Sequence, residues 1–153
     1  MRTFAVRFKS VRWNGIQDRL PMIPVRLSWG ERNIRTQMLL DSGSNGTFLE
    51  RWVAEYLRLP LSSVPTQARG ATGTMAVVHT EVDFRIAKRT TTGEEDEAWR
   101  LAPVAVAAGA HDPLPYSVLG RRPFMLRYEI TFREADEVVI LRELPLSKRG
   151  GGL

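Results

Sequence analysis

The chain has 153 residues, 43% of them hydrophobic and 25% charged, which fits a single globular domain of ordinary size. It contains no cysteine, which excludes a disulfide framework, a thiolate metal site and a cysteine nucleophile. The two histidines, His79 and His111, lie far apart in no ligand-like spacing. We therefore expect no metal site and no cofactor.

The formal net charge is +5, and all but three of the basic residues are arginines. A basic chain can bind nucleic acid or an anionic membrane, or it can be a soluble protein whose coding sequence favours arginine. The arginines are spread along the sequence, which favours the second interpretation. No apolar run approaches the roughly 18 residues of a membrane span, and the N-terminus lacks the apolar core of a signal peptide. We expect a cytoplasmic protein with no membrane or nucleic-acid partner.

The first forty residues predict β-strands. Apolar and polar residues alternate over 4–8 and again over 23–29, and residues 34–40 become increasingly apolar toward their end. The polar segment 30–33 joins the last two runs, which indicates a β-hairpin.

One helix is predicted, over residues 47–59. Thr47 is a good N-cap, and Glu50 three residues later completes a capping box. Trp52 and Tyr56 share one stripe of this helix, where we expect them to pack in the core. The helix should end before Pro60, because a residue that precedes proline is pushed out of the α region.

A long hairpin is predicted over residues 65–85, with its turn at residues 70–73. His79, Glu81 and Asp83 fall on its charged face, where we expect them to be exposed and solubilising. A polar, acidic loop follows over residues 90–97.

The last third of the chain is again β in pattern. Residues 99–108 form an apolar strand, and a second apolar run at residues 116–121 leads into Gly120. One helical turn is expected at 123–126, followed by paired strands at 128–132 and 138–141. We expect one domain over residues 1–146 and a flexible Gly-rich tail over 147–153.

Asp41 is the residue with the strongest chemical signal. Two large apolar residues, 39 and 40, lead directly into it, which is an unusual place for a charge. Gly43 lets the backbone approach the carboxylate closely, while Ser42 and Ser44 add hydroxyls that donate and accept hydrogen bonds. The same tripeptide is also common in ordinary Asx-turns, so on its own it leaves both interpretations open.

A hydrolase without cysteine or metal, and with poorly placed histidines, has few catalytic options. Two carboxylates that share one proton are among them. Like charges about 3 Å apart cannot both ionise, so one member takes a proton from water while the other polarises the carbonyl.

Four features follow one another along the chain: the Asp41 loop, a helix, a Gly-tipped hairpin, and Val118-Leu119-Gly120-Arg121. In this order the chain resembles the retropepsin-like aspartic peptidases over roughly residues 23–141. The resemblance implies an all-β, closed acid-protease barrel with one main helix and a flap hairpin. It also implies an aspartic endopeptidase that acts on peptide or protein substrates.

Position by position, the resemblance implies that Asp41 is the catalytic aspartate. The implied active-site support comprises Ser42, Gly43 and Ser44. The implied flap tip comprises Gly70, Ala71, Thr72 and Gly73. The implied brace behind the active loop comprises Val118, Leu119, Gly120 and Arg121.

Arg121 departs from the family pattern in its partner. In retroviral members this arginine pairs with an aspartate just after the catalytic loop, whereas here the corresponding residue is Asn45. The ion pair cannot form as such, so a neutral hydrogen bond or another acid must replace it.

The Asp41 motif occurs once, since no other aspartate is followed by Ser-Gly or Thr-Gly. A dyad needs two acids, so a catalytic Asp41 requires a C2 homodimer in which two copies meet at the axis. The terminal strands 4–8 and 138–141 are candidates for the dimer sheet, because both could offer unpaired edges. The alternative is a catalytically silent module of the same fold that binds peptides or dimerises.

Overall fold

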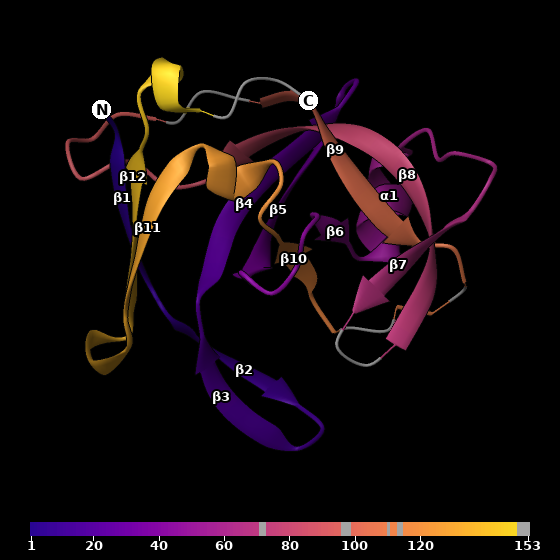
Figure 1. Cartoon of the computed structure of the whole chain (residues 1–153), viewed down its shortest axis with the longest axis horizontal. Coiled ribbons are helices and arrows are strands. Elements are labelled where there is room, and N and C mark those ends of the chain that lie inside the picture. Colours follow the sequence, from indigo (N-terminus) through magenta and orange to yellow (C-terminus); the bar gives the residue numbers. More distant parts are fainter. Residues whose placement is uncertain (71–72, 96–98, 110, 113–114, 150–153) are drawn as a thin grey trace.

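The computed structural model describes residues 1–70, 73–95, 99–109, 111–112 and 115–149, and it is mostly β (Figure 1). The strands are β1 (Thr3–Arg7), β2 (Lys9–Trp13), β3 (Ile16–Leu20), β4 (Met22–Trp29), β5 (Arg32–Leu40), β6 (Phe48–Leu49), β7 (Thr66–Gly70), β8 (Gly73–Ile86), β9 (Trp99–Ala107), β10 (Ser117–Leu119), β11 (Tyr128–Arg133) and β12 (Val138–Glu143). The helices are α1 (Arg51–Leu57) and the 3-10 turns η1 (Phe124–Leu126), η2 (Glu134–Asp136) and η3 (Leu146–Lys148). The predicted all-β class is confirmed.

The main sheet has the strand order β4-β5-β10-β6-β9-β8-β7, and β4 also pairs with β8. The order therefore returns to its starting strand, and β7 extends from β8 as the second arm of a hairpin. The predicted β4–β5 hairpin is antiparallel throughout. The short strand β10 runs parallel to the end of β5, which brings two segments distant in sequence side by side.

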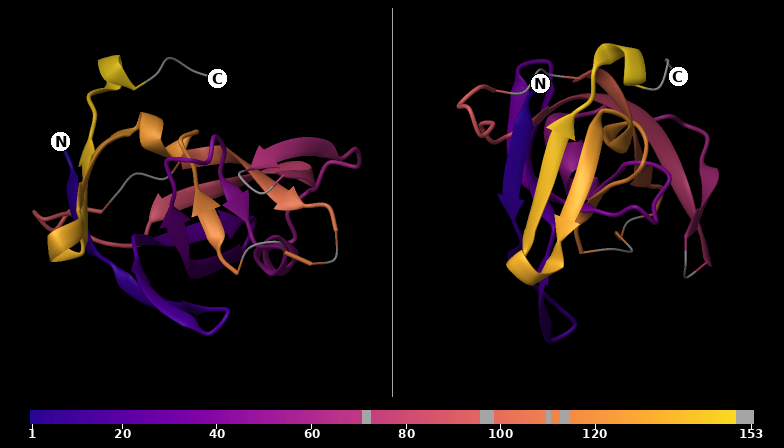
Figure 2. Two further views of the ribbon diagram at one scale, coloured as in Figure 1. Left: turned by 60° about the horizontal axis from the view of Figure 1, so that its bottom comes forward. Right: turned by 60° about the vertical axis from the view of Figure 1, so that its left-hand side comes forward.

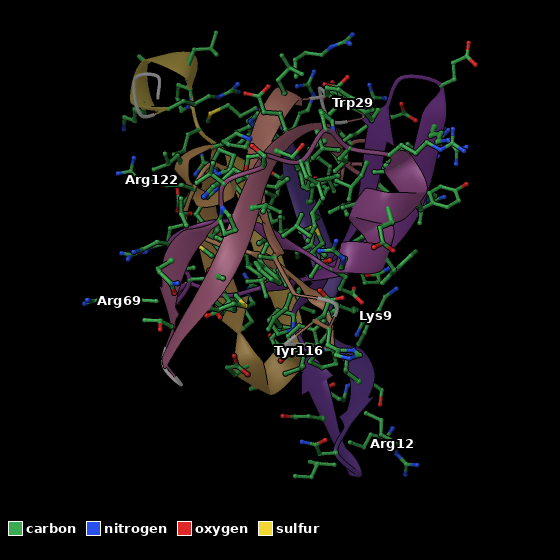
Figure 3. The ribbon with its side chains drawn as sticks, turned by 90° about the vertical axis from the view of Figure 1, so that its right-hand side faces the viewer. Lys9, Arg12, Trp29, Arg69, Tyr116 and Arg122 are labelled. Atoms are coloured by element: carbon green, nitrogen blue, oxygen red, sulfur yellow. The ribbon has the colours of Figure 1, made fainter. Side chains whose placement is uncertain are left out.

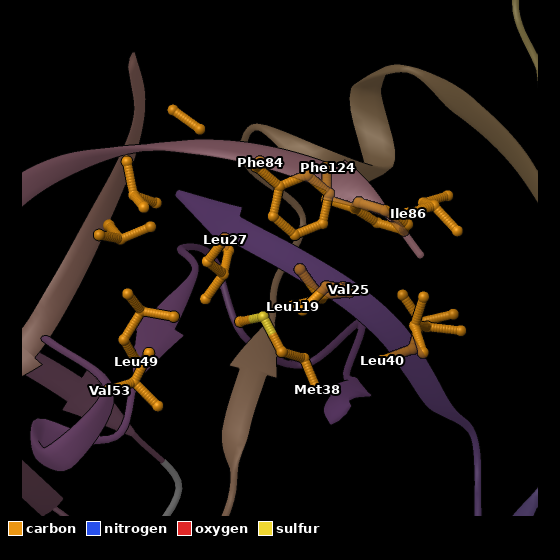
Figure 4. Close-up of a cluster of buried hydrophobic side chains, with 14 of the residues drawn as sticks. Val25, Leu27, Met38, Leu40, Leu49, Val53, Phe84, Ile86, Leu119 and Phe124 are labelled. Carbon is orange, nitrogen blue, oxygen red and sulfur yellow. The ribbon is translucent and has the colours of Figure 1, made fainter. Parts of the chain in front are cut away.

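The core lies inside this sheet, where the alternating apolar residues of the strands converge (Figure 4). Val25 and Leu27 of β4 are fully buried, whereas Arg26 between them is exposed. Phe124 of η1 closes one end of the core, with its ring 5.9 Å from Phe84 and 5.6 Å from Trp99. The alternation of apolar and polar residues along the sequence thus correctly predicted which face of the strands is buried.

A second sheet, of order β1-β12-β11, lies beside the main one and contains the first and the last strand of the chain (Figures 1 and 2). Phe4 pairs with Leu141, and Ile130 pairs with Leu141 from the other side. The strand at 138–141 therefore lies in the middle of its sheet, and the prediction that it offers an unpaired edge is wrong. The flanking strands β1 and β11 hold the outer positions.

The helix begins four residues later than predicted. Phe48 and Leu49 form β6 instead, paired with β10 on one side and β9 on the other, so sheet pairing overrides the capping-box pattern. The cap comes from a distant loop, because both carboxylate oxygens of Asp112 accept a hydrogen bond from the Arg51 N–H at 2.9 Å. Thr47 is buried, and its hydroxyl donates to the Arg122 carbonyl at 3.0 Å.

Trp52 and Tyr56 are not core residues, since their exposed fractions are 47% and 49%. Val53, Ala54 and Leu57 form the buried face of α1, and the two aromatic residues lie on its exposed side. Trp52 donates from its ring nitrogen to Glu50 at 2.8 Å.

The strands β2 and β3 form a hairpin that projects from the body of the molecule and that the sequence analysis missed (Figure 1). Its turn is Asn14-Gly15, with φ values of 48° and 76°. A type I′ turn requires two successive residues in the left-handed conformation, so the Asn-Gly pair in the sequence could have predicted this hairpin.

The described part of the chain contains no helix that is both long enough and apolar enough to cross a membrane. At the C-terminal end, η3 occupies part of the predicted tail, and residues 150–153 lie outside the described residues. The domain and tail boundaries stay predictions.

Candidate active site

Asp41 lies at the end of β5, where the two apolar runs of the sequence meet. Val118 pairs with Leu39 and Leu119 with Leu40 in the parallel ladder between β10 and β5. The ladder continues one step further, because the Asp41 N–H donates to the Leu119 carbonyl at 3.0 Å. Backbone hydrogen bonds from a buried pair of strands therefore fix the position of the aspartate.

The Asp41 carboxylate is held by its own loop. Its Oδ1 accepts a hydrogen bond from the Gly43 N–H at 2.8 Å. A Cβ at position 43 would lie 3.1 Å from that oxygen, which is closer than nearly all real contacts, so glycine suits the loop. No described residue donates to the second oxygen of Asp41. Asp41 is half-buried and Ser42 is exposed, so the carboxylate group remains accessible.

Gly120 is the point at which the brace crosses the Asp41 loop. A Cβ on Gly120 would lie 1.9 Å from the Gly46 carbonyl oxygen and 2.8 Å from that of Ser44. Only a glycine permits this approach. Beyond the crossing, the Arg121 N–H donates to the Ser44 carbonyl at 2.8 Å and the Arg122 N–H to the Asn45 carbonyl at 2.9 Å.

Arg121 finds a neutral partner in place of the aspartate seen in the family pattern. Its guanidinium donates a hydrogen bond to the Asn45 side-chain carbonyl. The hydroxyl of Ser44 donates to the Gly46 carbonyl at 2.8 Å, which ties the far side of the same loop. The contact between brace and loop thus survives the change from acid to amide.

The predicted flap corresponds to the hairpin of β7 and β8, whose last described pair is Gly70 with Gly73. Ala71 and Thr72 lie outside the described residues. The hairpin strands contact the brace strand through one apolar cluster. Its buried members are Phe48, Val77, Ala107 and Val118, and its partly buried members are Ala68, Met75, Ala105 and Tyr116.

The sequence matches the aspartyl protease family model over residues 23–122, which is more than half of the chain and includes both the Asp41 loop and the brace. The chain belongs to the aspartyl protease family. A search among curated proteins finds no significant match. The predicted resemblance to retropepsin-like peptidases is confirmed.

A solved retropepsin-like protease structure has the same fold. A retropepsin-like aspartic protease from Rickettsia conorii superposes with a TM-score of 0.59 at 14% identity, over 92% of this chain and 99% of that one. The EIAV protease, in an inhibitor complex, gives a TM-score of 0.49 at 19% identity, over 72% of this chain and 88% of that one. The Rickettsia structure establishes the likeness in fold.

Two other polar residues singled out in the sequence, His79 and Asp83, lie on β8 and not on the Asp41 loop. His79 is exposed, and its ring shares a hydrogen bond of 2.7 Å with the Thr66 hydroxyl. Asp83 accepts from the Leu101 N–H at 3.0 Å and forms an ion pair of 3.4 Å with Arg100. Within the described ranges, no group of three or more histidine and acidic side chains could hold a metal ion.

Glu50 and Ser117 form a support that sequence reasoning missed. The Glu50 N–H donates to the Ser117 hydroxyl at 2.9 Å, and the Ser117 N–H donates back to the Glu50 carboxylate at 3.2 Å. The exchange ties the start of α1 to the start of β10, directly behind the brace. These residues are 67 positions apart, so no local pattern could have joined them.

A buried ion cluster lies at the end of β12, also unpredicted. Burial alone would raise the pKa of Glu143, but a hydrogen bond from Arg127 and the nearby charge of Arg149 outweigh it and lower that pKa. The Glu143 carboxylate lies 3.2 Å from Arg127 and 2.6 Å from Arg149. The Arg127 guanidinium also stacks 4.3 Å above the Trp99 ring. The cluster joins the second sheet to the segment that follows the brace.

Proposed function

We propose that this aspartyl protease is a homodimeric endopeptidase in which two Asp41 carboxylates, one from each subunit, activate a water molecule. The observation that carries the proposal is the hydrogen bonding of the two Asp41 carboxylate oxygens. One oxygen is fixed by the Gly43 N–H, and the other accepts no hydrogen bond from the described residues. Because the motif occurs once in the chain, the second acid must come from a second copy.

The chemistry follows from the charge repulsion between two adjacent carboxylates. Only one of them ionises, and it takes a proton from water as the water oxygen attacks the peptide carbonyl carbon. The protonated partner donates its proton to the carbonyl oxygen, which gives a neutral tetrahedral intermediate. The first carboxyl group then returns its proton to the peptide nitrogen, and the second carboxylate takes a proton from a hydroxyl of the intermediate. The carbonyl re-forms as the C–N bond breaks, which releases the two products.

The remaining loop residues have supporting roles in this proposal. Gly43 holds the carboxylate through its N–H, and the exposed Ser42 hydroxyl reaches across to the partner loop. Ser44 and Gly120 keep the loop against the brace. None of these residues needs to exchange a proton with substrate.

The substrate in this proposal is an extended peptide covered by the β7–β8 flap. Main-chain hydrogen bonds between peptide and strand would supply affinity, as in strand addition. The apolar cluster that joins Val118 to the flap strands favours apolar side chains beside the cleaved bond. Peptide libraries that vary the two residues around the bond would measure this preference.

The test of the function is cleavage of unfolded casein from acidic to neutral pH, with and without pepstatin. Asp41→Asn should abolish cleavage while the far-UV CD spectrum stays unchanged. Asp18→Asn is the matched control, because Asp18 is an exposed aspartate on β3 and should leave cleavage intact. Full activity of the Asp41 variant would overturn the proposal. Absence of cleavage by the unaltered chain at every pH would favour the silent module.

A further inference from the structure

Three arginines form a row across the outer face of the main sheet. Arg26 of β4 pairs directly with Arg35 of β5 on one side and with Arg85 of β8 on the other. Adjacent strands lie about 4.8 Å apart, and like charges in directly opposed positions destabilise a sheet. The arginine row therefore works against the stability of the sheet that carries it.

The arginine row lies in a wider basic surface. A depression of about 310 Å³ is lined by Arg26, Arg35, Arg85, Ile86, Ala87, Lys88, Arg89 and Glu95. Five of these side chains are cationic and one is a carboxylate. Arg35 donates to the Ala87 carbonyl at 3.0 Å, but within the described ranges Arg26, Lys88 and Arg89 form no side-chain hydrogen bond or ion pair. These cations are available to an external anion.

One carboxylate of the chain itself already contacts this surface. Glu95, from the acidic segment that follows β8, places a carboxylate oxygen 3.5 Å from the Arg85 guanidinium. Both side chains remain largely exposed, at 41% for Arg85 and 66% for Glu95, so the contact is loose and replaceable. A carboxylate on an acidic peptide segment can therefore occupy the same position.

Carboxylates fit this surface better than a nucleic acid does. Planar guanidinium groups bind carboxylates and phosphates alike in a bidentate manner, so the distinction comes from the rest of the surface. Single-stranded nucleic acids gain much of their affinity by stacking bases on aromatic rings, and no aromatic side chain is among the residues that line the depression. The surface also offers a flat sheet and no helix that could enter a groove.

We propose that the arginine row and its neighbours bind an acidic segment of a protein partner. The site lies on the outer face of β4, β5 and β8 and shares no residue with the Asp41 loop. Binding therefore does not depend on the proposed peptidase activity. Glu95 competes with the partner for Arg85, which limits non-specific binding.

The test measures binding of a fluorescent glutamate-only peptide by anisotropy at low salt. The full chain is used with Asp41→Asn, which prevents cleavage of the probe. Arg26→Gln with Arg35→Gln should raise Kd about tenfold or more, because two charge-assisted contacts are lost. Arg12→Gln with Arg58→Gln is the matched control. These exposed arginines lie on the β2–β3 hairpin (Figure 3) and directly after α1, and their loss should change Kd less than about twofold.

Three results would overturn the proposal: no binding of the peptide at low salt, equal losses in the two double variants, or tighter binding of a single- or double-stranded DNA of equal charge. Thermal unfolding checks the fold, and relief of like-charge contacts should leave the Arg26/Arg35 variant at least as stable as the parent. If that variant unfolds, Lys88→Gln with Arg89→Gln replaces it, since both residues are exposed beyond the end of β8. The same loss of affinity is expected, and unchanged affinity would overturn the proposal.

Discussion

Replacing Gly120 by alanine should disrupt the Asp41 loop, because the added methyl group has no room. The added Cβ would lie 1.9 Å from the Gly46 carbonyl oxygen and 2.6 Å from its carbon. Both contacts are with backbone, so no flexible side chain can move aside. The loop or the brace must shift.

The expected cost has two parts. Overpacking of a tight site costs about 1–3 kcal/mol. A shift also breaks the hydrogen bonds from Arg121 to the Ser44 carbonyl and from Asp41 to the Leu119 carbonyl, each worth about 1 kcal/mol. The free energy of unfolding should therefore fall by about 3–5 kcal/mol, a large share of the total of about 5–15 kcal/mol for a domain.

Urea unfolding of Gly120→Ala beside Gly46→Ala measures this cost. Gly46 is the ideal control, because it lies at the same crossing and a Cβ there would meet nothing within 4 Å. We expect a large fall in the urea midpoint for the Gly120 variant and a small change for the Gly46 variant. Equal midpoints for the two variants would refute the assigned role of the crossing.

Three further changes test the supports around the site. Asp112→Ala should lower the free energy of unfolding by about 1 kcal/mol through loss of the α1 cap, as urea unfolding would show, and no loss would contradict that role. Glu143→Gln should lower the free energy of unfolding by about 3 kcal/mol at pH 7, because it breaks a buried ion cluster. Since the pKa of Glu143 lies below its unfolded value of 4.5, its contribution is complete above that value and is lost as the pH falls through the folded pKa. The gap between parent and variant should therefore close in acid, and a gap independent of pH would contradict the assignment. Leu57→Ala should lower the free energy of unfolding by about 2–5 kcal/mol, because Leu57 is buried. Trp52→Ala should lower it far less, because Trp52 is half exposed. Equal losses in urea unfolding would place Trp52 in the core.

The parts of the fold that follow from local periodicity were predictable from sequence. Alternating apolar residues marked the buried faces of β4, β5 and β12, and the apolar run into Gly120 marked the brace. The meeting of that run with the run into Asp41 followed from the family resemblance, and the structure provides its physical basis in the β10–β5 ladder.

Features that depend on distant partners were not predictable. A capping box favoured a helix from Thr47. Phe48 and Leu49 instead form a strand that pairs with β9 and β10. The buried face of α1 is formed by Val53, Ala54 and Leu57, which leaves Trp52 exposed, and the cap came from Asp112, 61 residues from Arg51. Local propensity is weak against two ladders of hydrogen bonds.

The basic surface could not be predicted from the sequence either, because its charges come from different strands. Arg26 and Arg35 lie on consecutive strands but Arg85 lies far along the chain, so the arginines seemed dispersed. Only the register of β4 against both β5 and β8 places them side by side. A surface built across strands leaves no cluster in the sequence.

The central claim is that each active site needs an Asp41 from two subunits, and a subunit-mixing experiment tests it most directly. Parent chain and Asp41→Asn chain are unfolded together in varied ratios, refolded at constant total concentration, and assayed for cleavage of casein. A site shared between subunits predicts that activity falls as the square of the parent fraction, because mixed dimers are inactive. A linear fall would mean that each chain carries its own complete site and would contradict the account.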